Sequence, residues 1–271
     1  MRWFLWILCG PIRGDGATGA AGRSRPAIIG VDEGRAMAEN RAATVLQDGV
    51  LEELGREIVW GRVEAGHRYR LDTLQERFDI SRTVARDVMR VLDSLGLVTP
   101  RRSVGVVVNA AGEWNVYAPH VIRWRLEGPA SARQFDELTQ LRIAVEPLAA
   151  RSAADHAGAP ARARIVELGA RLRALGEAGE LEAFLEADVE FHELVLRESG
   201  NSMFAALTGA VGEVLAGRTH AGLMPFHPVP EALDAHEALA AAIAAGEGAL
   251  AERAARAIAA EVHEALGHDD A

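Results

Sequence analysis

The sequence contains no lysine and only one cysteine, Cys9. A single cysteine excludes an internal disulfide and fits a reducing compartment, so we expect a cytoplasmic protein. All 29 basic residues are arginine, and alanine and glycine are abundant. We attribute this composition to a coding bias rather than to a function.

Long hydrophobic runs are also missing. The seven apolar residues from Trp3 to Cys9 follow one arginine. They are too few to span a membrane and barely enough for a signal peptide, so we expect neither membrane association nor export. The Gly-, Ala- and Arg-rich sequence that follows predicts a disordered extension over residues 1–36. Met37 is then a candidate for the natural start.

The common catalytic motifs are absent as well. The sequence has no phosphate-binding loop, no nucleophile elbow with an ordered Ser, His and Asp, and no reactive thiol. We therefore expect a protein that is not an enzyme.

Acidic residues outnumber basic ones, and the net charge of −10 at first argues against binding to nucleic acid. The charges are unevenly distributed, however. Residues 41–109 contain 11 arginines against 10 acidic residues, and residues 1–40 contain 5 against 4, which leaves −12 for residues 110–271. The acidic part would repel DNA, so we expect DNA contacts within residues 41–109 and a steep dependence on salt.

An amphipathic helix that could bind DNA is predicted to begin at Ser81, a suitable N-cap, and to end at Gly96. Arg82, Arg86 and Arg90 are four residues apart and therefore share its polar side. Apolar residues recur at helical spacing on the other side. These residues are Val84, Val88, Val91, Leu92 and Leu95.

A shorter helix is predicted just before it, with Leu71, Leu74 and Phe78 on its apolar side and Asp72 as its cap. A short helix, a tight turn and a basic helix form the helix-turn-helix layout, whose second helix enters the major groove of DNA. Apolar residues 97–99 and 106–108 then flank a basic turn that contains glycine. This pattern predicts a β-hairpin, the wing.

These segments resemble the GntR family of winged-helix transcriptional regulators over about residues 43–109. The resemblance implies that Arg82 and Arg86 contact operator bases and phosphates, and that Arg102 and its neighbours reach the minor groove. Two residues depart from the pattern: Asp72 stands where some members have an arginine that contacts DNA, and Ser103 replaces a common wing glycine. The expected DNA-binding residues are Ser81, Arg82, Thr83, Arg86, Arg90, Arg101, Arg102 and Gly105.

Helical periodicity dominates the rest of the chain. Leu46, Val50, Leu54 and Ile58 predict a helix before the DNA-binding motif, and from Ala130 onward the spacing predicts about six helices. Breaks are expected near Gly158 to Pro160, Gly176, Gly200 and Asn201, Pro225 to Pro230, and Gly246 to Gly248. The aromatic linker from Trp114 to Trp124 is expected to pack one domain against the other.

Ionisable residues interrupt the apolar stripes of two predicted helices. Asp188 and His192 lie one turn apart on the inward face of one helix, and His236 lies on the inward face of another. A buried carboxylate requires a partner, and carboxylate with imidazole suits Zn²⁺, Ni²⁺ or a related divalent ion. A hydrogen-bonded core cluster without metal is the alternative.

This half resembles the FCD ligand-binding domain of the FadR subfamily within the GntR regulators, over about residues 128–266. The resemblance implies that Asp188, His192 and His236 hold the ion and that a carboxylate effector completes its coordination. Many members have a fourth ligand, a histidine, where this chain has Ile258, so we expect three protein ligands. The matching residues are Leu141, Arg142, Glu146, Pro147, Ala149, Ala150, Asp188, His192, Ser199, Gly200, Asn201, His236, Ile243 and Gly246.

Arg142 has two interpretations. It precedes Glu146 by four residues, which fits an exposed ion pair on one helix. The resemblance implies instead that Arg142 lines the cavity and binds an effector carboxylate through both guanidinium nitrogens. Arg218 is a second candidate for that role.

The sequence as a whole predicts a mainly α protein. Its parts are the extension (1–36), a winged helix-turn-helix domain with a small β wing (37–110), a linker (111–129) and an all-helical effector-binding domain (130–268). We expect a homodimeric transcriptional regulator, a repressor in our interpretation, on double-stranded palindromic operator DNA. A sugar acid or hydroxy acid at a zinc or nickel site would control it. For the C-terminal half, a metal-dependent hydrolase and a metal-free ligand-binding module are the alternatives.

Overall fold

The computed structural model describes residues 30–102 and 105–267. The chain divides into two compact units, residues 1–42 and 43–271. The described part of the first unit is the beginning of helix α1 (Gly30–Val59). Most of the predicted extension, residues 1–29, lies outside the described residues. Its last seven residues, 30–36, are helical, and the sequence from residue 31 to residue 42 has no proline and one glycine to interrupt a helix.

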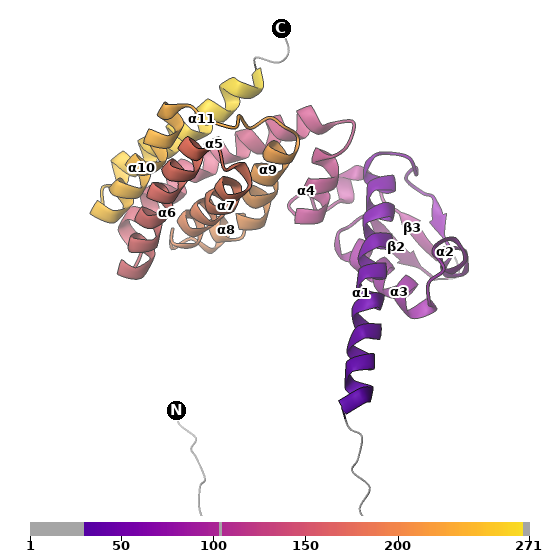
Figure 1. Cartoon of the computed structure of the whole chain (residues 1–271). Coiled ribbons are helices and arrows are strands. Elements are labelled where there is room, and N and C mark those ends of the chain that lie inside the picture. Colours follow the sequence, from indigo (N-terminus) through magenta and orange to yellow (C-terminus); the bar gives the residue numbers. More distant parts are fainter. Residues whose placement is uncertain (1–29, 103–104, 268–271) are drawn as a thin grey trace, which may run out of the picture. The chain divides into compact units, whose positions relative to one another are not determined.

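The winged-helix core lies between α1, α2 (Leu71–Phe78), α3 (Arg82–Ser94) and a small sheet (Figure 1). Leu54 and Ile58 of α1 are buried in this core, as the periodicity predicted. Leu46 is 44% exposed, so the predicted core stripe of α1 extends one turn too far toward the N-terminus.

The ends of α3 are as predicted. The Ser81 hydroxyl accepts a hydrogen bond from the Val84 amide at 3.2 Å, and Gly96 follows the helix with a left-handed φ of 73°. The buried face differs in detail, because Ala85 and Met89 are also buried whereas Val84 is half-buried.

The cap predicted for α2 is wrong. Arg70 occupies the N-cap position, and no side chain caps the helix there. Asp72 lies within the first turn, where its carboxylate contacts Arg70 at 2.9 Å. Its negative charge also interacts favourably with the positive end of the helix dipole.

The wing is a sheet of three antiparallel strands in the order β1-β3-β2: β1 (Arg68–Tyr69), β3 (Gly105–Val108) and β2 (Val98–Arg101). The hairpin was predicted, with Arg101 opposite Gly105. Strand β1 was not, because two residues are too short to form a recognisable pattern. Gly105 has a φ of 106°, and a Cβ there would lie 2.7 Å from the Tyr69 carbonyl oxygen, so glycine is required for this pairing.

The linker contains a short 3-10 turn (Ala111–Glu113) and helix α4 (Pro119–Leu126). The two sides of α4 belong to different hydrophobic cores. Val121 and Trp124 lie in the winged-helix core, whereas Ile122 and Leu126 pack with residues of the helical domain. The linker is therefore an ordered element shared by both cores.

The C-terminal domain is entirely helical in its described residues, which confirms the predicted fold class (Figure 1). The helix predicted to break near Gly176 continues to Ala178, because Gly176 is buried against Leu233 and Phe184 and the chain turns at Gly179 instead. None of the described helices is both long and apolar enough to cross a membrane. The helices are α5 (Ser131–His156), α6 (Ala159–Ala178), α7 (Leu181–Arg197), α8 (Ser202–Ala205), α9 (Thr208–His220), α10 (Pro230–Ala245) and α11 (Gly248–Gly267).

Candidate functional sites

The polar side of α3 is open to solvent. Arg82, Arg86 and Arg90 are exposed, and Arg90 contacts Asp87 of the same helix at 2.8 Å. The remaining predicted DNA-binding residues are exposed as well; they are Ser81, Thr83, Arg101, Arg102 and Gly105.

The wing lies beside this arginine-bearing face. A surface cavity of about 210 Å³ is lined by Arg86 and Arg90 of α3 and by Pro100 and Val106 of the hairpin. The basic helix and the wing therefore form one continuous surface, as a winged helix-turn-helix requires.

A second candidate site lies inside the helical domain. Asp188 and His192 of α7 and His236 of α10 are 8%, 3% and 5% exposed. One ligand atom from each residue can be chosen so that all three atoms lie within 4.8 Å of one another. The structure thus brings together the three residues that interrupted the predicted apolar stripes.

Hydrogen bonds assign the protons of both imidazoles. His236 Nδ1 lies 2.7 Å from the Ala232 carbonyl oxygen, which can only accept, so Nδ1 carries the proton. His192 Nδ1 lies 3.0 Å from the Glu146 carboxylate and donates to it in the same way. The Nε2 atoms of both rings then face the interior of the cluster.

The interior of the cluster lacks hydrogen bonds. Asp188 Oδ1 lies 3.3 Å from His236 Nε2 and 3.4 Å from His192 Nε2. Among the described residues, neither Asp188 Oδ1 nor His236 Nε2 has a hydrogen-bond partner of good geometry. Lone pairs at such distances repel each other unless a cation, either a proton or a metal ion, lies between them.

The donor set fits a divalent metal ion. Two imidazole nitrogens and one carboxylate oxygen are typical ligands of Zn²⁺ and related ions. Each imidazole also donates its other N–H to a carboxylate or carbonyl oxygen, which is the usual support of a metal-bound histidine. The same residues would hold a proton if no metal were bound.

Glu146 of α5 contacts the cluster in a way that was not predicted from the sequence. Its carboxylate accepts from His192 Nδ1 and also contacts Arg142, at 2.6 Å through Nε and 3.3 Å through Nη2. From the sequence, Glu146 was a residue of the family pattern and a partner of Arg142; its contact with His192 was not predicted, because that contact depends on how α5 packs against α7.

Charges within the cluster shift its pKa values. Burial alone would raise the pKa of Glu146, but Arg142 and His192 outweigh it and hold that pKa at about 2. Burial likewise opposes the ionised form of Asp188, yet attraction to the nearby His192 and His236 imidazoles keeps its pKa well below the ordinary value. Burial lowers the pKa of His192, but the two carboxylates outweigh burial and raise it to about 9. Without metal, His192 therefore holds the compensating proton.

Arg142 pairs with Glu146, but the pair is buried, so the interpretation of Arg142 as part of an exposed ion pair is wrong. The two side chains are 3% and 4% exposed. The guanidinium edge formed by Nε and Nη2 is occupied by Glu146, and Nη2 is also 3.5 Å from His192 Nε2. Arg218 of α9 is 7% exposed and lines the same cavity.

The cavity beside the cluster is small, at about 20 Å³. This volume accommodates one water molecule or ion. Its walls include Arg142, Arg218 and the three cluster residues, together with Ile258 of α11. Segment 221–229 closes another side with Met224, Pro225 and Pro228.

The fold and sites define a winged-helix DNA-binding protein with a helical ligand-binding domain, and comparison with known proteins agrees. Residues 46–108 match the gntR family of bacterial regulatory proteins, and residues 137–261 match the FCD domain. The chain is 32% identical over 212 residues to the galactonate operon transcriptional repressor of Escherichia coli strain K12, covering 77% of this chain and 91% of that protein. It is 26% identical over 212 residues to the probable D-xylose utilization operon transcriptional repressor of Paenarthrobacter nicotinovorans, covering 78% of this chain and 84% of that protein.

Among solved structures, the protein Lar, described as controlling expression of the Listeria monocytogenes agr system, is similar with a TM-score of 0.52. It is 15% identical, and the match covers 82% of this chain and 96% of that chain. At this identity the likeness shows the fold alone.

The chain therefore belongs to the GntR family of bacterial transcriptional regulators and carries an FCD domain. The order of the two domains is that of the FadR subfamily, as the resemblance implied. The relatives are transcriptional regulators rather than enzymes, as the missing catalytic motifs led us to expect.

Proposed function

We propose that this regulator is a homodimeric repressor whose operator affinity is controlled by an organic acid bound at a divalent metal ion. The ion, zinc or nickel, would be held by Asp188, His192 and His236. The observation that carries this proposal is the clustering of three buried ligand atoms within 4.8 Å of one another, with Asp188 Oδ1 and His236 Nε2 lacking hydrogen bonds among the described residues.

The charges around the cavity favour an anionic effector. Asp188 and Glu146 carry two negative charges, and Arg142 and Arg218 carry two positive charges, so these four side chains sum to zero. With neutral histidines, a divalent ion would leave a net charge of +2 inside a buried site. A carboxylate ligand compensates part of that charge and can contact the ion and Arg218 together.

The names of the relatives and the volume of the cavity both bear on the chemical class of the effector. The E. coli relative is named for the galactonate operon, and a sugar acid supplies both a carboxylate and hydroxyl groups. A six-carbon acid does not fit a cavity of about 20 Å³. Its entry requires movement of the walls, for which segment 221–229 is our candidate because it connects two helices without belonging to either.

In the DNA-binding half, we propose that α3 enters the major groove and the wing approaches the minor groove. Arg82, Arg86 and Arg90 would contact bases and phosphates, and Arg101 and Arg102 would add wing contacts. Ser81, Thr83 and Gly105 would contact the DNA backbone next to these arginines. Two copies of the domain would bind two halves of a palindromic site.

The DNA contacts are tested with Arg86→Ala. We expect it to weaken operator binding about 5- to 150-fold, because a good arginine contact to a base contributes about 1–3 kcal/mol. Arg133→Ala, which removes an exposed arginine of α5, is the control and should bind normally. Equal operator affinity of the two variants would contradict the assignment of α3 as the recognition helix.

The metal site is tested by elemental analysis and zinc titration of wild type, His192→Ala and His156→Ala. His156 is exposed at the end of α5 and serves as the control. We expect one ion per chain in wild type and in His156→Ala, and none in His192→Ala. A wild-type protein that binds no divalent ion would favour the alternative, an Asp–His–His cluster closed by a proton.

A further inference from the structure

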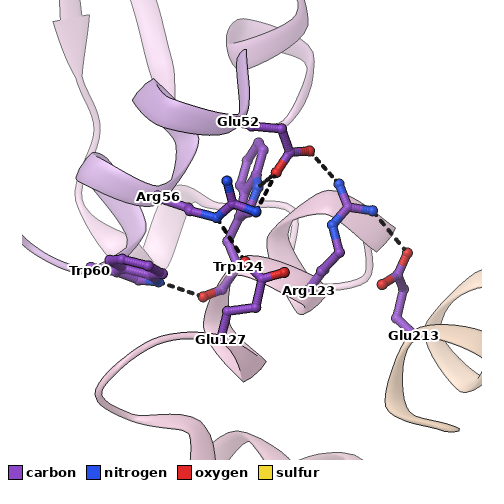
Figure 2. A network of polar contacts seen from close by, with 7 residues as sticks. All are labelled: Glu52, Arg56, Trp60, Arg123, Trp124, Glu127 and Glu213. Atoms are coloured by element: carbon purple, nitrogen blue, oxygen red, sulfur yellow. Dashed lines mark hydrogen bonds and ion pairs between the residues drawn. The ribbon is translucent and has the colours of Figure 1, made fainter. Parts of the chain in front are cut away.

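Helix α4 is firmly attached to the winged-helix domain (Figure 2). The Trp124 side chain is fully buried, and its indole nitrogen donates to Glu52 of α1 at 2.7 Å. Trp60, which directly follows α1, donates through its indole nitrogen to the Trp124 carbonyl oxygen at 2.7 Å. Arg56 adds an ion pair of 2.7 Å with Glu127 at the end of α4. The linker helix is therefore held as part of the DNA-binding module.

The same helix contacts the effector domain through apolar packing and through Arg123. Ile122 and Leu126 pack with residues of α5 and α9. Arg123 Nη1 lies 3.4 Å from Glu213 Oε1 of α9, while its Nη2 lies 2.5 Å from Glu52 of α1 (Figure 2). One guanidinium thus bridges a helix of the DNA-binding domain and a helix of the effector domain.

Two carboxylates of the helical domain contact α4, and Glu213 is the less tightly held. Glu137 accepts from Arg133 at 2.8 Å and from Arg125 at 2.9 Å, and these contacts lower its pKa. Glu213 is partly buried, and burial raises its pKa although Arg123 opposes this. Because charges interact more strongly away from water, the energy of a partly buried carboxylate such as Glu213 is sensitive to small movements of its helix.

Helix α9 also reaches the effector cavity. Leu215 and Arg218 line the cavity, and Glu213 precedes Arg218 by five residues, about 7.5 Å along a helix axis. The packing of α9 against α4 is close, since a Cβ added at Gly217 would lie 2.7 Å from Leu126. A displacement of α9 at the cavity would therefore change its packing against α4.

We propose that the contact between Glu213 and Arg123 determines how the winged-helix domain is held on the effector domain, and thereby the half-site spacing that the dimer accepts on DNA. This inference rests on the proposed function, because spacing has meaning only for a dimer on two half-sites. An effector that displaces α9 would act on the same contact. It can shift the equilibrium between two placements of the winged-helix domain only by as much as its affinities for those two placements differ.

The test uses full-length protein and duplex DNA. Wild type first selects its preferred duplex from a random pool, and the half-site spacing is then lengthened or shortened by one base pair. Each base pair moves a half-site by about 3.4 Å and rotates it by about 35°, so a firmly held dimer discriminates between the duplexes. We expect Glu213→Gln to keep wild-type affinity for a single half-site but to reduce this discrimination about two- to fivefold.

Glu190→Gln is the matched control, since it removes one carboxylate of an ion pair between α7 and α6 that contacts neither α4 nor the cavity. It should discriminate like wild type. Arg123→Lys is a second test variant that keeps the charge but cannot hold both partners in the same geometry. If Glu213→Gln melts below the assay temperature, the discrimination measured for Arg123→Lys decides the test.

Wild-type discrimination in Glu213→Gln or Arg123→Lys would overturn the inference and leave the proposed function intact. If wild type selects no paired half-sites, the proposed dimeric operator binding and the inference are both overturned. Loss of discrimination in Glu190→Gln as well would show a general loosening of the domain, which also contradicts a specific role for Glu213.

Discussion

Glu146→Gln tests the buried ion pair beside the proposed metal site. The guanidinium of Arg142 contacts both oxygens of Glu146, at 2.6 and 3.3 Å, and the two side chains are 3% and 4% exposed. Removing one charge of a buried pair costs about 3–5 kcal/mol, because the remaining charge is left uncompensated. The amide oxygen of glutamine still accepts a hydrogen bond, so we expect a loss of about 3 kcal/mol. That loss corresponds to roughly 6–12 °C in melting temperature for a chain of this size.

The same substitution is expected to weaken zinc binding about 10–100-fold, because His192 Nδ1 loses the carboxylate that orients it. Glu190→Gln is again the matched control. Arg164 contacts both oxygens of Glu190 at 2.7 Å, but the side chains are 34% and 45% exposed. An exposed pair of similar geometry contributes about 0–1 kcal/mol.

The assay is urea and thermal unfolding of both variants without metal, followed by zinc titration by calorimetry. We expect a large stability loss and weaker zinc binding for Glu146→Gln alone. Equal stability losses in the two variants would refute the argument from burial. Unchanged zinc affinity in Glu146→Gln would refute its proposed support of His192.

Two further substitutions test the packing of α4 and the open coordination position. Gly55→Ala should destabilise the chain by about 1–3 kcal/mol in urea, because its Cβ would lie within 2.3 Å of the Trp124 ring. In Gly49→Ala, on the same helix, the added Cβ has no atom within 4 Å, so this variant should be more stable than wild type by up to about 1 kcal/mol. If Gly49→Ala were less stable than Gly55→Ala, the packing of Gly55 against Trp124 would be contradicted. Ile258→His adds an imidazole at the cavity wall and should strengthen zinc binding about tenfold or more. Unchanged affinity would show that residue 258 does not face the ion.

Local features of the fold were predictable from the sequence where local chemistry determines them. Ser81 caps α3 and Gly96 follows it because hydroxyl capping and a left-handed turn depend on neighbouring backbone atoms. The break predicted near Gly176 occurs three residues later, at Gly179, because the small size of Gly176 is used for packing against Leu233 within the helix. Asp72 also fits a capping pattern, but the chain begins α2 two residues earlier than that pattern assumes.

The candidate metal site was predictable in part. Asp188, His192 and His236 are recognisable because ionisable side chains interrupt apolar stripes, and the structure places them together. The roles of Glu146 and Glu213 depend on which helices pack against each other, which no periodicity indicates. An i, i+4 pair such as Arg142 and Glu146 is visible in the sequence, but its burial is not.

Operator binding as a function of metal and acid tests the central claim most directly. The operator affinity of zinc-loaded and zinc-free wild type would be titrated with D-galactonate and a panel of related sugar acids and hydroxy acids, beside His192→Ala. We predict that one of these acids weakens operator binding of zinc-loaded wild type, and that zinc-free wild type and His192→Ala bind the operator without responding. An equal response of His192→Ala, or no response of zinc-loaded wild type to any of the acids, would contradict the account.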